Sequence, residues 1–125
     1  TQFGKGKLTG RQNGTLAGTY KVILTKKGKK HPLFLGLPES PKFHFANYLH
    51  VLPSCYQNKG VLAIQDDSPA IVIDHGESWF STQFHPESRK QSWDIYYGLQ
   101  EDSYISKYSD NHDGPKLIKN FFTNF

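Results

Sequence analysis

Three short β-rich segments in the middle of the chain, separated by turns of hairpin length, constrain the fold most. They are residues 60–64, 70–74 and 78–84. The stretches between them read Asp-Asp-Ser-Pro and Asp-His-Gly-Glu, and Asp, Ser, Pro and Gly are the residues that favour tight turns. Short strands with turns of this length predict an antiparallel meander.

Further strands and a C-terminal helix are predicted around this meander. Thr19–Leu24 is β-rich, and Lys42–Val51 alternates aromatic and polar residues, so both are expected to be strands, the second with a bend. His31–Leu37 predicts a short apolar turn of helix. Pro115–Phe125 places its apolar residues at helical spacing, with a proline in the first turn. Residues 1–15, rich in Gly and Lys, predict a loop.

The third segment of the meander ends in Gln83-Phe84-His85-Pro86-Glu87, which places an imidazole and a carboxylate two residues apart. A thiol or hydroxyl nucleophile needs a neighbouring imidazole as base, and the imidazole needs a carboxylate to fix its tautomer and stabilise its cation. Side chains two apart in an extended segment point to the same side, and Pro86 stiffens the link. The pattern is that of a base and its orienting acid. A strand-end histidine bonded to backbone is the alternative.

Residues 78–87 resemble the closing motif of class I glutamine amidotransferases, an apolar strand followed by Gln-Phe-His-Pro-Glu. Residues 25–38, with Pro-Leu-Phe and Gly-Leu-Pro, are similar to a connection in the GMP-synthase-like members of that family. The resemblance implies an α/β fold: the C-terminal part of a flavodoxin-like sheet with a small antiparallel extension and a terminal helix. The chain would be a single partial domain, divided into a basic Gly-rich loop (1–16), a strand-rich core (17–87), an insertion (88–113) and the terminal helix (114–125).

The resemblance also implies roles for two residues. His85 would be the catalytic base and Glu87 the third member of a Cys-His-Glu triad that hydrolyses glutamine through a thioester, without a cofactor. The family's nucleophile lies in a Gly-x-Cys-x-Gly turn upstream of the matched region. We therefore expect it in a missing N-terminal half or on a partner chain. Cys55, the single cysteine, lies in a Pro-Ser-Cys-Tyr-Gln loop without a glycine elbow, so we do not expect it to be the nucleophile.

Two departures from the family pattern bear on the site. Where the family has a His-Gly- or His-Ser-type segment whose backbone helps to hold glutamine, this chain has Phe45-Ala46-Asn47, the candidate substrate-binding residues. Residues 88–113 are a long insertion, expected to be a loop or a pair of short helices. It would serve as a lid, an acceptor contact or a partner surface. Its aromatic residues would either stack a ring ligand or, as we expect, anchor the insertion on its own core: Trp93, Tyr96, Tyr97, Tyr104 and Tyr108.

Two other functions stay open. A non-catalytic binding module derived from the same fold would leave His85 and Glu87 as structural remnants, and Phe45 and the aromatic insertion favour it. Residues 1–38 carry eight of the 15 Lys and Arg and none of the 11 Asp and Glu, which would suit nucleic-acid binding. A solvated basic surface explains the same charges more simply, so nucleic acid is not an expected partner.

Composition and sequence patterns also lead to expectations about the compartment, metal content and oligomeric state of the protein. No apolar run approaches the ~18 residues of a membrane-spanning helix, no signal-peptide pattern is apparent, and the single cysteine excludes an intrachain disulfide. A cytoplasmic protein is expected on these grounds. Neither His-x-x-x-His nor Cys-x-x-Cys spacing occurs, so no metal is expected. Part of a sheet would leave strand edges and an apolar face uncovered, so we expect a homo-oligomer or a second segment.

Overall fold

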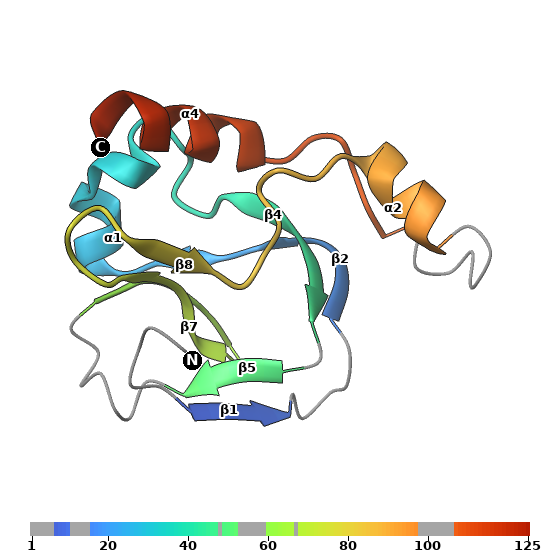
Figure 1. The fold of residues 1–125 in the computed structure, drawn as a ribbon, viewed down its shortest axis with the longest axis horizontal. Coiled ribbons are helices and arrows are strands. Elements are labelled where there is room, and N and C mark those ends of the chain that lie inside the picture. Colours follow the sequence, from blue (N-terminus) through green and yellow to red (C-terminus); the bar gives the residue numbers. More distant parts are fainter. Residues whose placement is uncertain (1–6, 11–15, 48, 53–59, 67, 98–106) are drawn as a thin grey trace.

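The structure is a computed structural model, and it describes residues 7–10, 16–47, 49–52, 60–66, 68–97 and 107–125. In these residues two short helices lie between the third and fourth strands, and two helices follow the last strand (Figure 1). The described elements are β1 (Lys7–Gly10), β2 (Leu16–Lys21), β3 (Ile23–Leu24), α1 (Lys26–Lys30), the 3-10 helix η1 (Pro32–Phe34), β4 (Lys42–Asn47), β5 (Leu49–Leu52), β6 (Val61–Gln65), β7 (Ser68–Asp74), β8 (Phe80–Thr82), α2 (Lys90–Tyr97) and α4 (Gly114–Asn124).

A four-stranded antiparallel sheet with the order β3-β6-β7-β8 lies at the centre of the described fold. Ile73 of β7 pairs with Val61 of β6 on one side and with Ser81 of β8 on the other. The predicted meander is therefore confirmed. Its central strand is buried on both faces over residues 70–73, which explains why that segment is a continuous apolar run rather than an alternating one.

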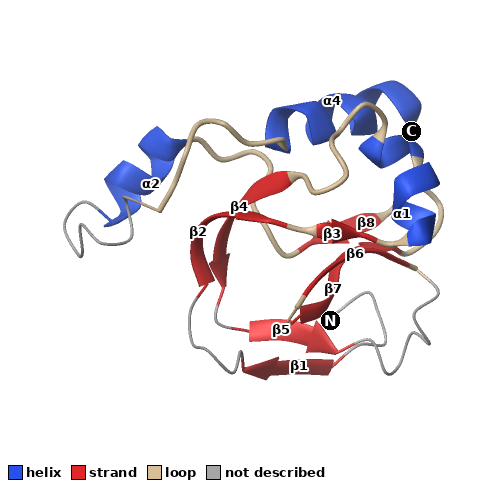
Figure 2. Ribbon diagram, turned by 180° about the vertical axis from the view of Figure 1, so that it is seen from behind, coloured by secondary structure: helices blue, strands red, loops and turns tan. Residues whose placement is uncertain are grey.

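Two two-stranded antiparallel ribbons complete the β structure (Figure 2). β2 pairs with β4, and the strand predicted over Thr19–Leu24 is divided between β2 and β3, where Val22 donates its N–H to the Pro41 carbonyl. β1 pairs with β5, with Lys7 opposite Leu52. The prediction of a loop over residues 1–15 is therefore wrong for residues 7–10, which form β1. Its pairing partner is distant in sequence, so local Gly and Lys content gave no sign of it.

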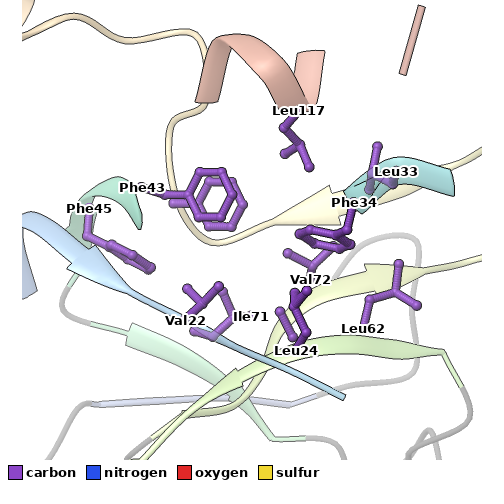
Figure 3. Packing of buried hydrophobic residues seen from close by; sticks show 12 residues of the cluster. Val22, Leu24, Leu33, Phe34, Phe43, Phe45, Leu62, Ile71, Val72 and Leu117 are labelled. Atoms are coloured by element: carbon purple, nitrogen blue, oxygen red, sulfur yellow. The ribbon is translucent and has the colours of Figure 1, made fainter. Parts of the chain in front are cut away.

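The main core lies between the central sheet, β4 and the C-terminal helix (Figure 3). Phe43 and Phe84 stack with ring centroids 3.8 Å apart and planes 4° apart, and Leu117 points from α4 into the same cluster. The terminal helix is confirmed. Asn120 fastens it by donating its amide to the carbonyls of Leu33 and Leu35, at 3.0 and 2.8 Å.

A short helix, α1, occupies the lysine-rich stretch after β3, where no helix was predicted. Thr25 caps it: the Thr25 hydroxyl accepts from the Gly28 N–H at 3.0 Å and lies 2.9 Å from the Val61 carbonyl, to which it can donate. The Thr25 N–H donates to the Leu62 carbonyl at 2.9 Å. Backbone contacts with β6 thus hold α1, and they also bring Gly28 directly against that strand.

None of the described helices has both the length and the apolar character that crossing a membrane requires.

Candidate functional site

The motif that carries His85 is fixed by backbone hydrogen bonds on both sides of it. Gln83 donates its N–H to the Ile71 carbonyl at 2.9 Å, and His85 donates its N–H to the His44 carbonyl at 2.8 Å. Phe84, between them, is buried in the core. The chain therefore leaves β8 with a defined direction, which turns the His85 side chain outward while Phe84 anchors the segment.

The imidazole of His85 and the carboxylate of Glu87 are in contact. Nδ1 of His85 lies 3.0 Å from Oε1 of Glu87, and the two side chains are 45% and 64% exposed. Because a carboxylate only accepts, Nδ1 carries the hydrogen of this bond. Nε2 is then the basic nitrogen, and it has no hydrogen-bond partner among the described residues. This is the tautomer that a general base of a triad uses.

A solvent-open hollow of about 280 Å³ adjoins this pair, lined by His85, Glu87, Ser88, Ser92 and Trp93. Its size is at the lower limit of small-molecule sites, which usually enclose about 300–1,000 Å³. Most of its lining comes from residues 88–93, at the start of the insertion. The hollow leaves the exposed imidazole accessible from solvent.

His44 of β4 is completely buried and contacts two residues that line the hollow, Ser88 and Trp93. Nε2 of its ring is 2.6 Å from the Ser109 carbonyl, so Nε2 carries a hydrogen. Nδ1 is 2.7 Å from the Ser88 hydroxyl and 3.2 Å from the Trp93 indole nitrogen, so it accepts. Burial lowers the pKa of His44 and outweighs the Ser109 bond, which raises it. His44 is therefore a neutral junction between β4 and both ends of the insertion.

A second histidine stacks on this buried ring. The rings of His44 and His112 have centroids 3.7 Å apart and planes 17° apart. Burial, and then repulsion from His44, lowers the pKa of His112. Asp110 raises the pKa of both histidines, but by less than burial lowers it. His85 and Glu87 also act on His44, and Asp113 acts on His112. Both imidazoles are thus neutral at pH 7.

This pair predicts that acid destabilises the fold. The unfolded chain binds protons at its ordinary histidine pKa of 6.5, whereas folded His44 and His112 bind them only at lower pH. Stability is then fully present above that value and is lost as the pH falls below it. Urea unfolding at pH ~7.5 and ~5.5 should show the loss, and His112→Phe, which keeps a stacking ring without a proton site, should reduce it. An H112F variant with the wild-type pH dependence would contradict this assignment.

No protein-family model and no curated protein matches the sequence, but solved structures match the fold. One is the protein SMU.1228c, with a TM-score of 0.72 at 16% identity over 95% of this chain and 55% of that one. Another, from Thermoplasma acidophilum and described as a GMP synthase subunit, matches with a TM-score of 0.65 at 15% identity, over 95% and 48%. A glutamine amidotransferase from Thermotoga maritima matches with a TM-score of 0.69 at 14% identity, over 94% and 54%.

The chain has a glutamine amidotransferase-like fold. The expected mixed α/β class, with antiparallel strands and a C-terminal helix, is confirmed. The chain spans about half the length of these structures. At 14–16% identity the similarity is one of fold, so the chemistry has to be argued from the residues of this chain.

Phe45, Ala46 and Asn47, the candidate substrate-binding residues, end strand β4 of this amidotransferase-like fold. Phe45 is fully buried in the core, and its carbonyl accepts the hydrogen bond of the Tyr108 hydroxyl. Ala46 is half-buried and pairs with Ala17. Among the described side chains that line the hollow beside His85, neither Phe45 nor Ala46 is present. The Phe45 side chain therefore supports the core, and its backbone oxygen is already bonded.

The insertion is anchored by two of its aromatic residues. Trp93 and Tyr108 are buried and stack at 4.8 Å, with planes 10° apart, against Ala17 of β2. The anchoring prediction is confirmed for these two. The side chains of Tyr96 and Tyr97 are not described, and Tyr104 and Cys55 lie outside the described residues. In the part of the chain that the structure describes, no three His, Cys, Asp or Glu side chains are grouped as metal ligands.

Sequence reasoning gave His44 no part in the site. It stands between two phenylalanines in an alternating strand, a pattern that says nothing about which residues will meet its ring. Ser88, Ser109 and Trp93 reach it from the insertion. The only available signal in the sequence was a polar residue at position 44. Strand alternation places it on the same side of the strand as Lys42 and Ala46.

Proposed function

We propose that this chain is part of a class I, GMP-synthase-like glutamine amidotransferase and supplies the base and the acid of its Cys-His-Glu triad. The observation that carries the proposal is the 3.0 Å contact between His85 and Glu87 beside an open hollow. The sequence motif around these residues and the amidotransferase-like fold support it. The motif and the fold are separate observations, and both fit the reaction that this contact suggests.

In this proposal His85 moves the protons of a two-step hydrolysis. Nε2 accepts the proton of a thiol, whose sulfur attacks the side-chain amide carbon of glutamine. The tetrahedral intermediate collapses when the C–N bond breaks, and the imidazolium gives its proton to the departing ammonia. Water then attacks the thioester with Nε2 as base, which yields glutamate and restores the thiol. Glu87 keeps Nδ1 protonated throughout, although its exposure lets water screen its charge.

We propose that the thiol belongs to another polypeptide segment, on a Gly-x-Cys-x-Gly turn. The structural neighbours are about twice as long as the matched region, which leaves room for such a segment. An apolar groove beneath α4, lined by Leu33, Phe80, Pro86, Leu117 and Phe121 among others, offers it a packing surface. The same need for cover would be met by a second copy of the chain. The reaction is assigned to the cytoplasm, where thiols stay reduced.

The direct test is to incubate the chain with glutamine and measure glutamate. The chain alone is expected to release none, and addition of the polypeptide with the nucleophile turn is expected to start the reaction. Cys55→Ala should not change that activity. Robust release by the chain alone that survives C55A would reject an external cysteine.

A non-catalytic binding module is the second candidate, because a buried Phe45 stands where the family has a polar residue. The coding sequence upstream of this region separates the two. A Gly-x-Cys-x-Gly turn in it favours the enzyme, and a start codon directly before Thr1 favours the module.

A further inference from the structure

Trp93 lies beside the proposed catalytic histidine, although it belongs to the insertion and not to the strand-rich core. The indole and the His85 imidazole have centroids 5.4 Å apart and planes 72° apart. Edge-to-face contacts of this kind are favourable for two aromatic rings. Since His85 is 45% exposed, the indole is the buried neighbour that limits where this ring can turn.

The indole is itself held on two further sides. It stacks on Tyr108 at 4.8 Å, and its Nε1–H points to the Ser88 hydroxyl at 3.1 Å and to His44 Nδ1 at 3.2 Å. Trp93 is 8% exposed. A rotation of the indole would leave a buried N–H without a partner, which is costly. Trp93 is therefore a rigid wall of the hollow.

A second connection runs from Trp93 to His85 through Ser88. The Ser88 hydroxyl accepts from the indole N–H, and two acceptors lie within reach of its own hydrogen: His44 Nδ1 at 2.7 Å and the His85 carbonyl at 2.9 Å. The Ser88 N–H also points to the His85 carbonyl, at 3.3 Å. The indole thus acts on both the ring and the backbone of His85.

We propose that Trp93 is a positioning residue for His85, and that it holds the imidazole where Nδ1 donates to Glu87 and Nε2 faces the hollow. The catalytic meaning of that orientation rests on the proposed function, but the orientation itself does not. In a neutral histidine the hydrogen bond of one ring nitrogen decides which nitrogen is protonated. When the wall is removed, the partly exposed ring turns away from Glu87 and the Nδ1–H preference is lost.

The test is the tautomer of His85, read from ring nitrogen chemical shifts of the ¹⁵N-labelled chain at a pH where the ring is neutral. Wild type is expected to show protonated Nδ1 and bare Nε2. Trp93→Ala should shift both resonances toward a tautomer mixture, whereas Trp93→Phe, which keeps an aromatic wall, should retain most of the wild-type pattern. Ile95→Ala is the matched control, since Ile95 is on the same helix but 76% exposed, and it should change nothing.

A folded W93A chain with the wild-type His85 pattern would overturn the proposal. Should W93A not fold, the wild-type chain decides: nuclear Overhauser contacts between the indole and imidazole protons are required, and their absence would also overturn it. With the nucleophile-bearing polypeptide added, W93A should lower kcat about 100-fold with little change in KM, as a displacement of ~1 Å does.

The two proposals fail in different ways. A wild-type assembly that does not hydrolyse glutamine, together with a W93A chain whose His85 pattern changes, would reject the proposed function and leave the positioning role intact. An active wild type, together with an unchanged pattern in folded W93A, would reject the positioning role alone.

Discussion

Replacing His85 with asparagine is expected to abolish glutamine hydrolysis by the assembled enzyme, with a loss in kcat on the order of 10³-fold or more. The substitution removes the nitrogen that accepts the thiol proton, and the serines that line the hollow are too weakly basic to replace it. Because His85 is partly exposed, asparagine leaves the core intact. Glutamate release under saturating glutamine measures the effect.

Two further variants serve as comparisons for the H85N result. Glu87→Gln keeps the size of the side chain, but its amide N–H can donate to Nδ1 and favour the wrong tautomer. It should therefore also lower kcat, by less than H85N, because the pair is largely exposed to water. His75→Asn removes an imidazole that lines a different hollow, and it should leave hydrolysis unchanged. An H85N enzyme that retains wild-type turnover would remove the triad from consideration.

Gly28→Ala is expected to be the most damaging small substitution for stability. A Cβ at this position would lie 2.0 Å from the Leu62 carbonyl oxygen and 2.9 Å from its carbon, so α1 or β6 must shift. Alanine favours a helix by about 1 kcal/mol over glycine, but the displaced α1 would strain the Thr25 cap and its bonds to β6. We expect a net loss of about 3 kcal/mol or more, in the range of the severe mutational effects.

Chemical denaturation monitored by tryptophan fluorescence measures this loss. Lys26→Ala is the matched control, because Lys26 is an exposed residue of the same helix and its truncation should change the free energy of unfolding by less than about 0.5 kcal/mol. A G28A chain as stable as wild type would mean that α1 does not pack on β6 as described.

Local chemistry explains which elements the sequence predicted. Residues 70–74 form a β-branched run between turn residues, and residues 115–125 carry a helical apolar stripe, so both were recognisable without tertiary information. Strand β1 was missed because its partner is β5. Helix α1 was missed because Lys-Lys-Gly-Lys-Lys is short and contains glycine, and its stability comes from Thr25 bonded to β6. Long-range backbone pairing cannot be read from such segments.

The candidate site was likewise predictable only where local spacing determines it. His85 and Glu87 were predicted together because two residues in an extended segment share a side, and the structure places them 3.0 Å apart. The roles of His44 and Trp93 depend on where a separate segment returns, which no local spacing encodes. The family resemblance placed Phe45 at a substrate-binding position, as a departure from the polar residue usual there, and its side chain lies in the core.

Both ends of the 88–113 segment meet at one imidazole: the Ser88 hydroxyl at Nδ1 of His44 and the Ser109 carbonyl at Nε2. The histidine therefore closes a loop of chain that contains helix α2, and Trp93 and Tyr108 pack beside it from within that loop. Doubling the length of such a loop costs only about 0.6 kcal/mol. Lengthening the chain between α2 and Lys107 should therefore leave both bonds to His44 intact, which makes that region a convenient place to attach a reporter group.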